Sequence, residues 1–264
     1  MERRRVLQVL ALGSAGTALG LGATSLYQAL AAETGHHWGY VGEAGPDHWG
    51  ELSPEFQVCG LGREQSPIDL NHPISADLSP LTLAYQPVPL KLINNGHTIQ
   101  VNIDGGSNNG GNTLELNGKT YTLKQFHFHH PSEHTVAGAA FPMEIHFVHT
   151  HADGSIAVLG VFIKEGAENA SLLPIWEAMP THESEVLTVR NATINPSDLL
   201  PNEGDTFRYF GSLTTPPCSE IVSWLVFQRP IEASRAQIEQ FSQIFAHNAR
   251  PVQPQNRRIL LESL

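Results

Sequence analysis

Alternation of polar and apolar residues is the feature that most restricts how this chain can fold. In Gln125-Phe126-His127-Phe128-His129 the polar side chains take one parity and the two phenylalanines take the other. Successive side chains of a strand point to opposite faces of a sheet, so this run predicts a strand with both histidines on one face. The other runs with strand character are LINNGHTIQVNI, NTLELNGKTYTLKQFHFH, MEIHFVHT, SIAVLGVFI and EIVSWLVF. Together they predict a mainly β (α+β) fold with a large sheet.

Turn and helix signals complete this outline. The Gly/Asn-rich residues 104–112 indicate a hairpin tip, and Asn117-Gly118 indicates a second tight turn. Helical spacing is convincing only in ENASLLPIWEAM and in SRAQIEQFSQIFAH, where Ser234 could cap the helix. No repeat or linker divides residues 33–264. We therefore expect a single domain with a few short peripheral helices.

The charge of the chain argues against nucleic-acid binding, so we expect the function to reside in a pocket. The 264 residues carry a formal net charge of −11, and the mature part has no block of Lys and Arg. Binding of nucleic acid requires clustered basic side chains, so we expect no nucleic-acid partner.

The first residues predict a twin-arginine-like signal peptide, 1–32, that is cleaved. Arginines occupy positions 3–5, no charge follows until Glu33, and Ala29-Leu30-Ala31 is a small-x-small cleavage pattern. An uncleaved membrane anchor is the alternative, because the uncharged run is long enough to span a bilayer. Its Gly, Ser and Ala content favours cleavage. We expect a mature domain, 33–264, that is periplasmic or secreted and has no membrane contact.

Export changes the meaning of the two cysteines, Cys59 and Cys218. They are the only cysteines in the sequence, and an oxidising compartment permits a disulfide between them. Such a bond would close a loop of roughly 160 residues and stabilise the fold by roughly 3–5 kcal/mol. Two buried free thiols are the alternative. Neither cysteine lies in a CxxC motif, so a cysteine metal site is not expected.

The histidines are the strongest candidates for a metal site. His127 and His129 share a strand face and could converge on one cation, and a third histidine would complete a three-histidine zinc site with an open fourth position. The candidates for this third ligand are His146, His149 and His151. His149 and His151 share one face of their strand, whereas His146 and Val148 share the other. Parity alone does not choose between these sets.

At this point the chain resembles the α-class carbonic anhydrases of the bacterial, exported type. The shared motifs span about residues 36–260 and are, in chain order, HWGY, QSPIDL, NNGH, QFHFH, SEHTV, EIHFVH, GSLTTPPCSE and NARPVQPQNRR. The resemblance implies reversible hydration of CO2 to bicarbonate and a proton by hydroxide bound to one Zn2+ per chain. It also implies a mostly antiparallel, twisted central sheet, a Cys59–Cys218 disulfide, and inhibition by sulfonamides or small anions. A monomer and a dimer are both compatible with it.

The resemblance resolves the ligand set and assigns supporting residues. The zinc ligands it implies are His127, His129 and His146. The residues implied to hold or support these ligands are Gln125, His134 and Glu144. A ligating imidazole needs an acceptor for its other nitrogen, and two of these residues lie two positions before a ligand on the same strand face. The histidines expected to be structural or exposed are His130, His149, His151 and His182.

Further roles follow from the resemblance alone. Thr214 would accept the proton of the hydroxide, Glu133 would take the proton of Thr214, and Thr215 would help to hold bicarbonate. The apolar residues implied to contact CO2 are Val148, Val158, Leu213 and Trp224. A histidine suits proton transfer near neutral pH, and His97 matches the proton shuttle of the family. The residues implied to order its water are Tyr40, Asn95 and Gln100.

Two departures and three rival interpretations accompany this resemblance. Gln100 stands where animal members often have Asn, and only residues 130–132 separate His129 from Glu133, a shorter loop than in animal members. The first rival is a non-catalytic binding module on the same fold. The second is a zinc hydrolase that acts mainly on esters. The third is a zinc reservoir, which the fourteen histidines suggest.

Overall fold

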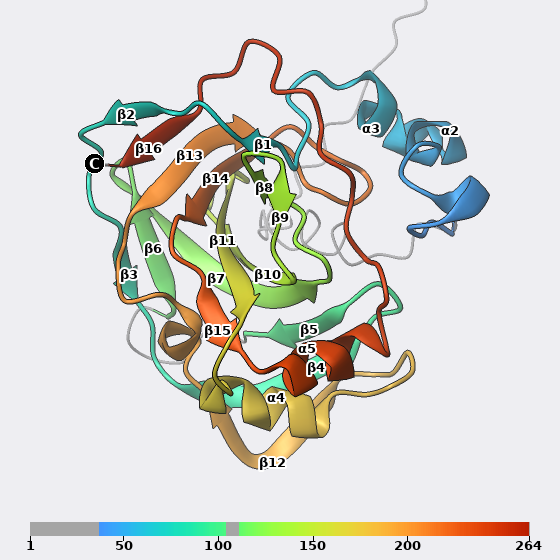
Figure 1. Cartoon of the computed structure of the whole chain (residues 1–264), viewed down its shortest axis with the longest axis vertical. Coiled ribbons are helices and arrows are strands. Elements are labelled where there is room, and N and C mark those ends of the chain that lie inside the picture. The colour runs from blue at the N-terminus through green and yellow to red at the C-terminus, as the bar shows by residue number, and fades with distance from the viewer. Residues whose placement is uncertain (1–36, 104–110, 264) are drawn as a thin grey trace, which may run out of the picture. The chain divides into compact units, whose positions relative to one another are not determined.

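A large twisted sheet organises the domain in this computed structural model, which describes residues 37–103 and 111–263 (Figure 1). The predicted signal peptide and most of the predicted hairpin tip lie outside the described residues. The strands of the large sheet are β2 (Ile74–Ala76), β3 (Thr82–Ala84), β4 (Val88–Asn94), β5 (Ile99–Asn102), β6 (Thr113–Leu116), β7 (Lys119–His129), β10 (Met143–Thr150), β11 (Ile156–Glu165), β12 (Leu187–Ile194), β13 (Thr206–Gly211), β14 (Val222–Phe227), β15 (Ile231–Ala233) and β16 (Leu261–Ser263). A smaller sheet contains β1 (Asp69–Leu70), β8 (Thr135–Val136) and β9 (Ala139–Ala140).

The strand order confirms the predicted fold class. The path through the large sheet is β12-β4-β5-β7-β10-β11-β14-β13-β16-β2, with β3, β6 and β15 beside it. Most neighbouring strands are antiparallel, and the parallel pairs of this sheet are β11 with β14, β11 with β15, and β16 with β2. The strands β7, β10 and β11 lie in the middle of this path.

Short helices cover the sheet as expected. The α-helices are α2 (Trp49–Leu52), α3 (Val58–Leu61), α4 (Leu173–Ala178) and α5 (Arg235–Ser242), and the 3₁₀ helices are η1 (Gly42–Ala44), η2 (Pro54–Phe56), η3 (Ala170–Leu172) and η4 (Pro196–Leu199). Ser234 caps the start of α5, as the sequence predicts, and it forms a capping box with Gln237. The helix ends at Ser242, before the end of the predicted run SRAQIEQFSQIFAH, but Ile244 and Phe245 still pack on the core. Within the described residues, no helix is long and apolar enough to cross a membrane.

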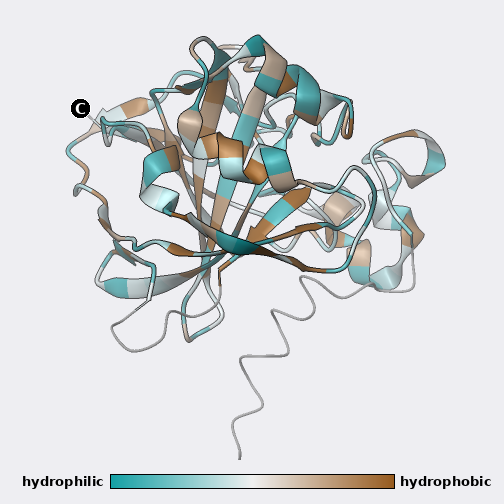
Figure 2. Ribbon diagram, turned by 90° about the horizontal axis from the view of Figure 1, so that it is seen from below, coloured by the Kyte–Doolittle hydropathy of each residue, from teal (hydrophilic) through white to brown (hydrophobic). Residues whose placement is uncertain are grey.

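The two phenylalanines of the His-rich strand form part of the main core. Phe126 and Phe128 are fully buried, and the ring of Phe128 lies 5.0 Å from Trp176 of α4 and 6.0 Å from Phe241 of α5. Burial of a phenylalanine stabilises a fold by roughly 1.5–3 kcal/mol. Because these rings occupy one face of β7, its histidines must point to the other. Figure 2 shows the same alternation of apolar and polar residues along the strands.

One turn prediction is confirmed and one needs correction. Asn117 and Gly118 have φ of 51° and 75° and connect β6 to β7 as a two-residue turn. Residues 104–112 do not join two strands that pair with each other. The strands on either side of this segment, β5 and β6, both pair with β7, one after the other. β5 and β6 are therefore successive partners of β7 rather than the two strands of a hairpin.

Cys59 and Cys218 form a disulfide. It joins α3 to the loop before β14, and its sulfurs pack with the buried Trp49 and Phe56 in a small apolar cluster. Figure 1 shows α2 and α3 together at one side of the sheet, away from α4 and α5. The disulfide therefore fixes the N-terminal helices to a loop that is distant in the sequence.

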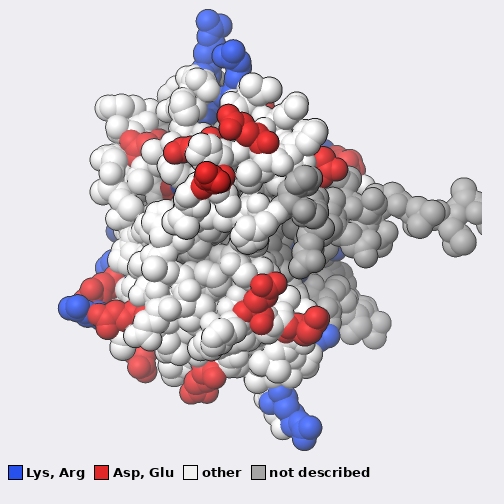
Figure 3. All heavy atoms as spheres, turned by 90° about the vertical axis from the view of Figure 1, so that its right-hand side faces the viewer, with Lys and Arg blue, Asp and Glu red and all other residues white. Residues whose placement is uncertain are grey.

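Charged side chains are scattered over the surface. The face drawn in Figure 3 has separated Asp and Glu side chains around a wide uncharged area, with Lys and Arg at its margins. No basic block covers the described part of this face.

His149 is buried on the core side of β10. Its Nε2 lies 2.6 Å from the Tyr85 hydroxyl and its Nδ1 lies 3.2 Å from the Ala157 carbonyl oxygen. Burial lowers the pKa of His149 from 6.5 to about 4, so the ring is neutral in the folded protein at neutral pH.

We predict that loss of the disulfide destabilises the domain. Replacing both Cys59 and Cys218 by Ala should lower the free energy of unfolding by roughly 3–5 kcal/mol, because the unfolded chain would regain the entropy of a 159-residue loop. Denaturant titration of the variant and of the oxidised wild type measures the difference. As a control, reduced wild type should lose the same free energy of unfolding as the variant. Unchanged stability in both the variant and the reduced wild type would contradict the prediction.

We predict that His149 makes the folded state sensitive to acid. Between pH 6.5 and 4, His149 is protonated in the unfolded chain but stays neutral in the folded protein, because it is buried. The free energy of unfolding must therefore fall as pH falls. From pH 7 to pH 4.5 the free energy of unfolding should drop about 2–3 kcal/mol more in wild type than in His149→Gln. Urea titrations at both pH values measure this. An identical drop in both proteins would rule out this source of acid sensitivity.

Candidate metal centre

The pairing of β7 with β10 brings three histidines together. His127 lies directly opposite His146 in this antiparallel pair, and His129 lies opposite Glu144. Residues opposite each other share a face of the sheet. The ring centroids of the three histidines are 4.6–5.4 Å apart, and one nitrogen of each lies within 4.8 Å of the others. The register therefore selects His146 as the third member, and a shift in pairing between Val148 and His149 leaves His149 beside Tyr85.

Each of the three imidazoles has one nitrogen held by an acceptor. Nδ1 of His127 lies 2.8 Å from Oε1 of Gln125, and Nε2 of His146 lies 2.9 Å from Oε1 of Glu144. Nδ1 of His129 lies 2.7 Å from the carbonyl oxygen of Asn248. These bonds leave Nε2 of His127, Nε2 of His129 and Nδ1 of His146 for a common ligand. Nε2 of His129 is buried and has no hydrogen-bond partner among the described residues.

The donor set fits a zinc ion. A metal ligand must be a neutral imidazole, and burial lowers the pKa of both His127 and His129. Burial also disfavours the His146 cation, but the adjacent Glu144 carboxylate outweighs it and raises the pKa of His146. Three imidazoles with an open fourth position are typical of catalytic zinc sites, for which carbonic anhydrase is itself the standard example. The buried, unpaired nitrogen of His129 supports this fit.

Glu144 is saturated with hydrogen bonds. Its Oε1 lies 2.7 Å from Nδ1 of His134 and 2.9 Å from Nε2 of His146. Its Oε2 accepts the backbone N–H groups of Glu133 and His134, both at 2.9 Å. Burial by itself would raise the pKa of Glu144, but the two imidazoles hold this pKa well below its usual value. His134, Glu144 and His146 could be taken for a second metal site by proximity, but these short contacts are hydrogen bonds already in use.

Glu133 faces the same nitrogens from the loop after β7. Its Oε1 accepts the backbone N–H of Arg250 at 2.9 Å. Its Oε2 is buried without a hydrogen bond in the described chain and lies 3.5 Å from Nε2 of His129 and 3.7 Å from Nδ1 of His146. Thr214 is also buried, in the loop that the disulfide holds. Glu133 thus has one oxygen fixed and one available to a hydroxyl donor, and a bond from Thr214 stays a prediction.

The predicted apolar wall lies beside the three histidines. Val148, Val158 and Trp224 stand in one row across β10, β11 and β14, because each is the register partner of the next. All three are buried, and Leu213 packs against their cluster. The Trp224 ring lies 4.8 Å from the His146 ring. The row therefore provides a hydrocarbon surface next to the candidate metal position.

The predicted shuttle residue lies at a turn near the site. The His97 ring stacks on Trp38 with centroids 3.7 Å apart. Burial and then the nearby His37 lower the pKa of His97 from 6.5 to about 4. This pKa is well below the value near 7 that suits proton transfer at neutral pH. The stacked position is therefore not the one in which His97 could carry a proton efficiently.

The other residues of the predicted proton path have separate local roles. The side-chain oxygen of Asn95 accepts the N–H groups of His97 and Thr98 and so shapes the turn. Gln100 lies across the strands from His127, and its amide donates to Asn102 at 2.6 Å. Tyr40 packs against Trp38 and Trp49. Burial, and then the charge of Glu133, raise the pKa of Tyr40 well above its usual value.

Sequence reasoning missed two residues near the C-terminus. Asn248 orients His129 through its main-chain carbonyl, a group that every residue has, so side-chain chemistry could not identify it. Arg250 is buried, and its guanidinium donates to Gln65 and to the carbonyl oxygens of Cys59 and Ser66. The one signal in the sequence that could have identified Arg250 is that it is the charged residue of the motif NARPV. Arg250 connects the loop of Glu133 to the disulfide-linked helices.

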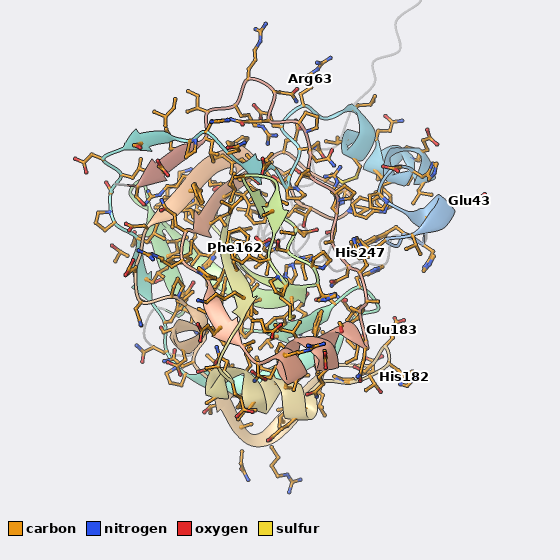
Figure 4. The ribbon with its side chains drawn as sticks, viewed as in Figure 1. Glu43, Arg63, Phe162, His182, Glu183 and His247 are labelled. Atoms are coloured by element: carbon orange, nitrogen blue, oxygen red, sulfur yellow. A yellow bond between two sulfur atoms is a disulfide. The ribbon has the colours of Figure 1, made fainter. Side chains whose placement is uncertain are left out.

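Several other histidines lie outside the site. His182 and His247 are exposed, and Figure 4 shows His182 at the edge of the molecule, with Phe162 near the middle. His130 bonds through Nδ1 to the Ala246 carbonyl oxygen, and His151 pairs with Asp153 on the surface. In the described part of the chain, the one three-histidine cluster is that of His127, His129 and His146.

Comparison with known proteins gives the same class of enzyme as the fold and the histidine cluster. The family model for eukaryotic-type carbonic anhydrase matches residues 44–264. A carbonic anhydrase of Nostoc sp. (strain PCC 7120) is 46% identical over 271 residues, covering 100% of this chain and 98% of the relative. The chain therefore belongs to the α-carbonic anhydrase family.

Solved structures agree with this assignment. The α-carbonic anhydrase from Thermovibrio ammonificans, in complex with the inhibitor sulfanilamide, matches with a TM-score of 0.81 and 48% identity, covering 86% of this chain and 99% of that chain. Dioscorin in complex with ascorbate also matches, with a TM-score of 0.78 and 32% identity over 86% of this chain and 97% of that chain. Because proteins solved with different ligands share this fold, the activity must be argued from the side chains of the site.

Proposed function

We propose that this chain is a zinc-dependent carbonic anhydrase that interconverts CO2 and bicarbonate outside the cytoplasm. The observation that carries the proposal is the set of three buried imidazoles, each with one nitrogen fixed by an acceptor and the other directed to a shared point. His127, His129 and His146 would hold the ion. Bound zinc would supply Lewis acidity that lowers the pKa of water to about 7, the value known for carbonic anhydrase itself.

Residues around the ion would orient the reaction. The Thr214 hydroxyl would accept a hydrogen bond from the attacking oxygen and donate its own proton to Oε2 of Glu133, which has no other partner among the described residues. Thr215 would help to hold the bicarbonate product. An acceptor that is fixed by the Arg250 N–H on its other oxygen can impose a single direction on Thr214.

The apolar row would accommodate CO2. Val148, Val158 and Trp224, with Leu213, present hydrocarbon where a small, uncharged substrate can rest beside the ion. The same wall offers few groups that could position a larger ester. This contrast favours CO2 hydration over the ester hydrolase interpretation, and an inactive binding module is less suitable because the sequence keeps all three proposed zinc histidines together with Thr214 and Glu133.

Proton release is assigned to His97. We propose that its ring carries protons between the site and the solvent from a more hydrated position than the stack on Trp38, where its pKa is about 4. Export to a periplasmic or extracellular compartment is proposed from the arginine-containing first 32 residues and is supported by the disulfide.

We predict about one zinc per chain and rapid CO2 hydration in the oxidised protein, both lost in His129→Ala. Removing one of three ligands should weaken zinc binding and abolish the activity that depends on it. Stopped-flow hydration and metal analysis of the same samples measure both properties. His182→Ala is the matched control, because that histidine is exposed and should change neither. Full zinc content without hydration would favour a binding module, and several zinc ions per chain would favour a reservoir.

We predict that His97→Ala lowers CO2 hydration in weak buffer by about tenfold or more, and that added imidazole restores it. The reason is that proton release, rather than attack on CO2, would limit turnover. Stopped-flow rates over a series of buffer concentrations measure the effect. If the variant equals wild type at every buffer concentration, His97 is not the shuttle.

A further inference from the structure

We propose that Tyr209 is a positioning residue for the metal centre: its hydroxyl fixes the tautomer of His134 and so keeps Glu144 available to orient His146. This inference rests on the proposed function, because it concerns the zinc ligand His146. Tyr209 belongs to β13, two strands away from β11 in the path of the sheet, and no sequence motif draws attention to it.

A continuous chain of hydrogen bonds leads from Tyr209 to the metal centre. The Tyr209 hydroxyl lies 2.7 Å from Nε2 of His134, and Nδ1 of His134 lies 2.7 Å from Glu144, which lies 2.9 Å from Nε2 of His146. On its other side the Tyr209 hydroxyl lies 2.9 Å from Oγ of Ser66. All five side chains are buried, so bulk water does not compete for these bonds.

Counting donors and acceptors shows in which direction each hydrogen bond of this series donates. Oε2 of Glu144 accepts two backbone N–H groups, and Oε1 lies within hydrogen-bond distance of Nδ1 of His134 and Nε2 of His146, so as a carboxylate it accepts from both imidazoles. If His134 carries its proton on Nδ1, its Nε2 is an acceptor and the Tyr209 hydroxyl donates to it. Ser66 then donates to the Tyr209 oxygen.

The opposite direction leaves a proton without an acceptor. If Tyr209 donated to Ser66, His134 would need protons on both nitrogens and would be a buried cation. The Ser66 hydroxyl would then have no acceptor among its described partners, because its other contact is the Ser212 N–H, a donor. Buried hydroxyl groups without a partner are costly. The neutral His134 tautomer with Tyr209 as donor satisfies every group.

The packing around Tyr209 holds this arrangement in place. Its ring is parallel to Trp224 at 6.3 Å, and the Arg258 guanidinium carbon lies 5.6 Å from its centre. Gly211 leaves room for the contact, because a Cβ there would collide with Ser66 Oγ and with the Tyr209 ring. Tyr209 therefore cannot turn away from His134 without displacing its neighbours.

The consequence for zinc follows from the acceptor strength of Glu144. Without the Tyr209 hydroxyl, Nε2 of His134 loses its donor, and the tautomer with the proton on Nε2 becomes accessible. That tautomer presents an unprotonated Nδ1 to the Glu144 carboxylate, which repels it and can shift the carboxylate away from His146. A zinc ligand whose second nitrogen is poorly held binds zinc more weakly.

The test compares Tyr209→Phe with Tyr85→Phe. Tyr85 is the matched control, because it is also a buried tyrosine whose hydroxyl contacts a buried imidazole, that of His149, but this pair has no bond to the zinc ligands. Zinc affinity is measured by competition with a chelator on the full-length folded proteins. We expect about tenfold weaker zinc binding in Tyr209→Phe, at the lower end of the range known for partners of zinc ligands, much of which comes from carbonic anhydrase. We expect a change of less than about twofold in Tyr85→Phe.

Each outcome has a defined meaning. Equal zinc affinity in wild type and Tyr209→Phe, or equal losses in both variants, overturns the positioning role but leaves the proposed function intact. Wild type that binds no zinc overturns both. If Tyr209→Phe does not fold, ¹⁵N NMR of the wild-type imidazoles decides instead. An unprotonated Nε2 in His134 supports the proposal, and a doubly protonated ring overturns it.

Discussion

The antiparallel pairing of β7 with β10 is the constraint on which the metal centre depends. It places His127 opposite His146 and His129 opposite Glu144, so two proposed ligands from one strand meet the third proposed ligand and the carboxylate that bonds to it from the next. The same strands bury Phe126 and Phe128 against the core on the other face. A one-residue slip would exchange these faces, so the burial of two aromatic rings maintains the register that assembles the histidines.

Much of this centre could be predicted from local pattern together with a family resemblance. Alternation in residues 125–129 was enough to place two histidines on one face, and the family resemblance added Glu144, two residues before His146, as an expected orienting carboxylate. Parity could not choose between His146 and His149. They lie on opposite faces of one strand, and the sequence does not say which face is shared with His127 and His129. That choice is made by long-range pairing and by the register shift after Val148, which no local pattern encodes.

The remaining features depend on groups that a sequence does not distinguish. Asn248 acts through a backbone carbonyl, and Tyr209 acts through a hydrogen bond to a residue 75 positions away. The lowered pKa of His97 results from its burial and then from the nearby His37, so the sequence around a histidine at a turn gives no sign of it. The predicted hairpin at 104–112 had the correct turn composition, but the pairing of both adjacent strands with β7 is decided by tertiary structure.

The contribution of Asn248 and Arg250 has a consequence for the order of events during synthesis. All three histidines have been synthesised when the ribosome reaches residue 146. The Asn248 carbonyl that orients His129 and the Arg250 N–H that holds Glu133 are synthesised about a hundred residues later. A nascent chain would therefore present three histidines without a finished geometry. Removal of residues 245–264 would therefore disturb the arrangement of the three histidines, although none of the removed residues is a proposed ligand.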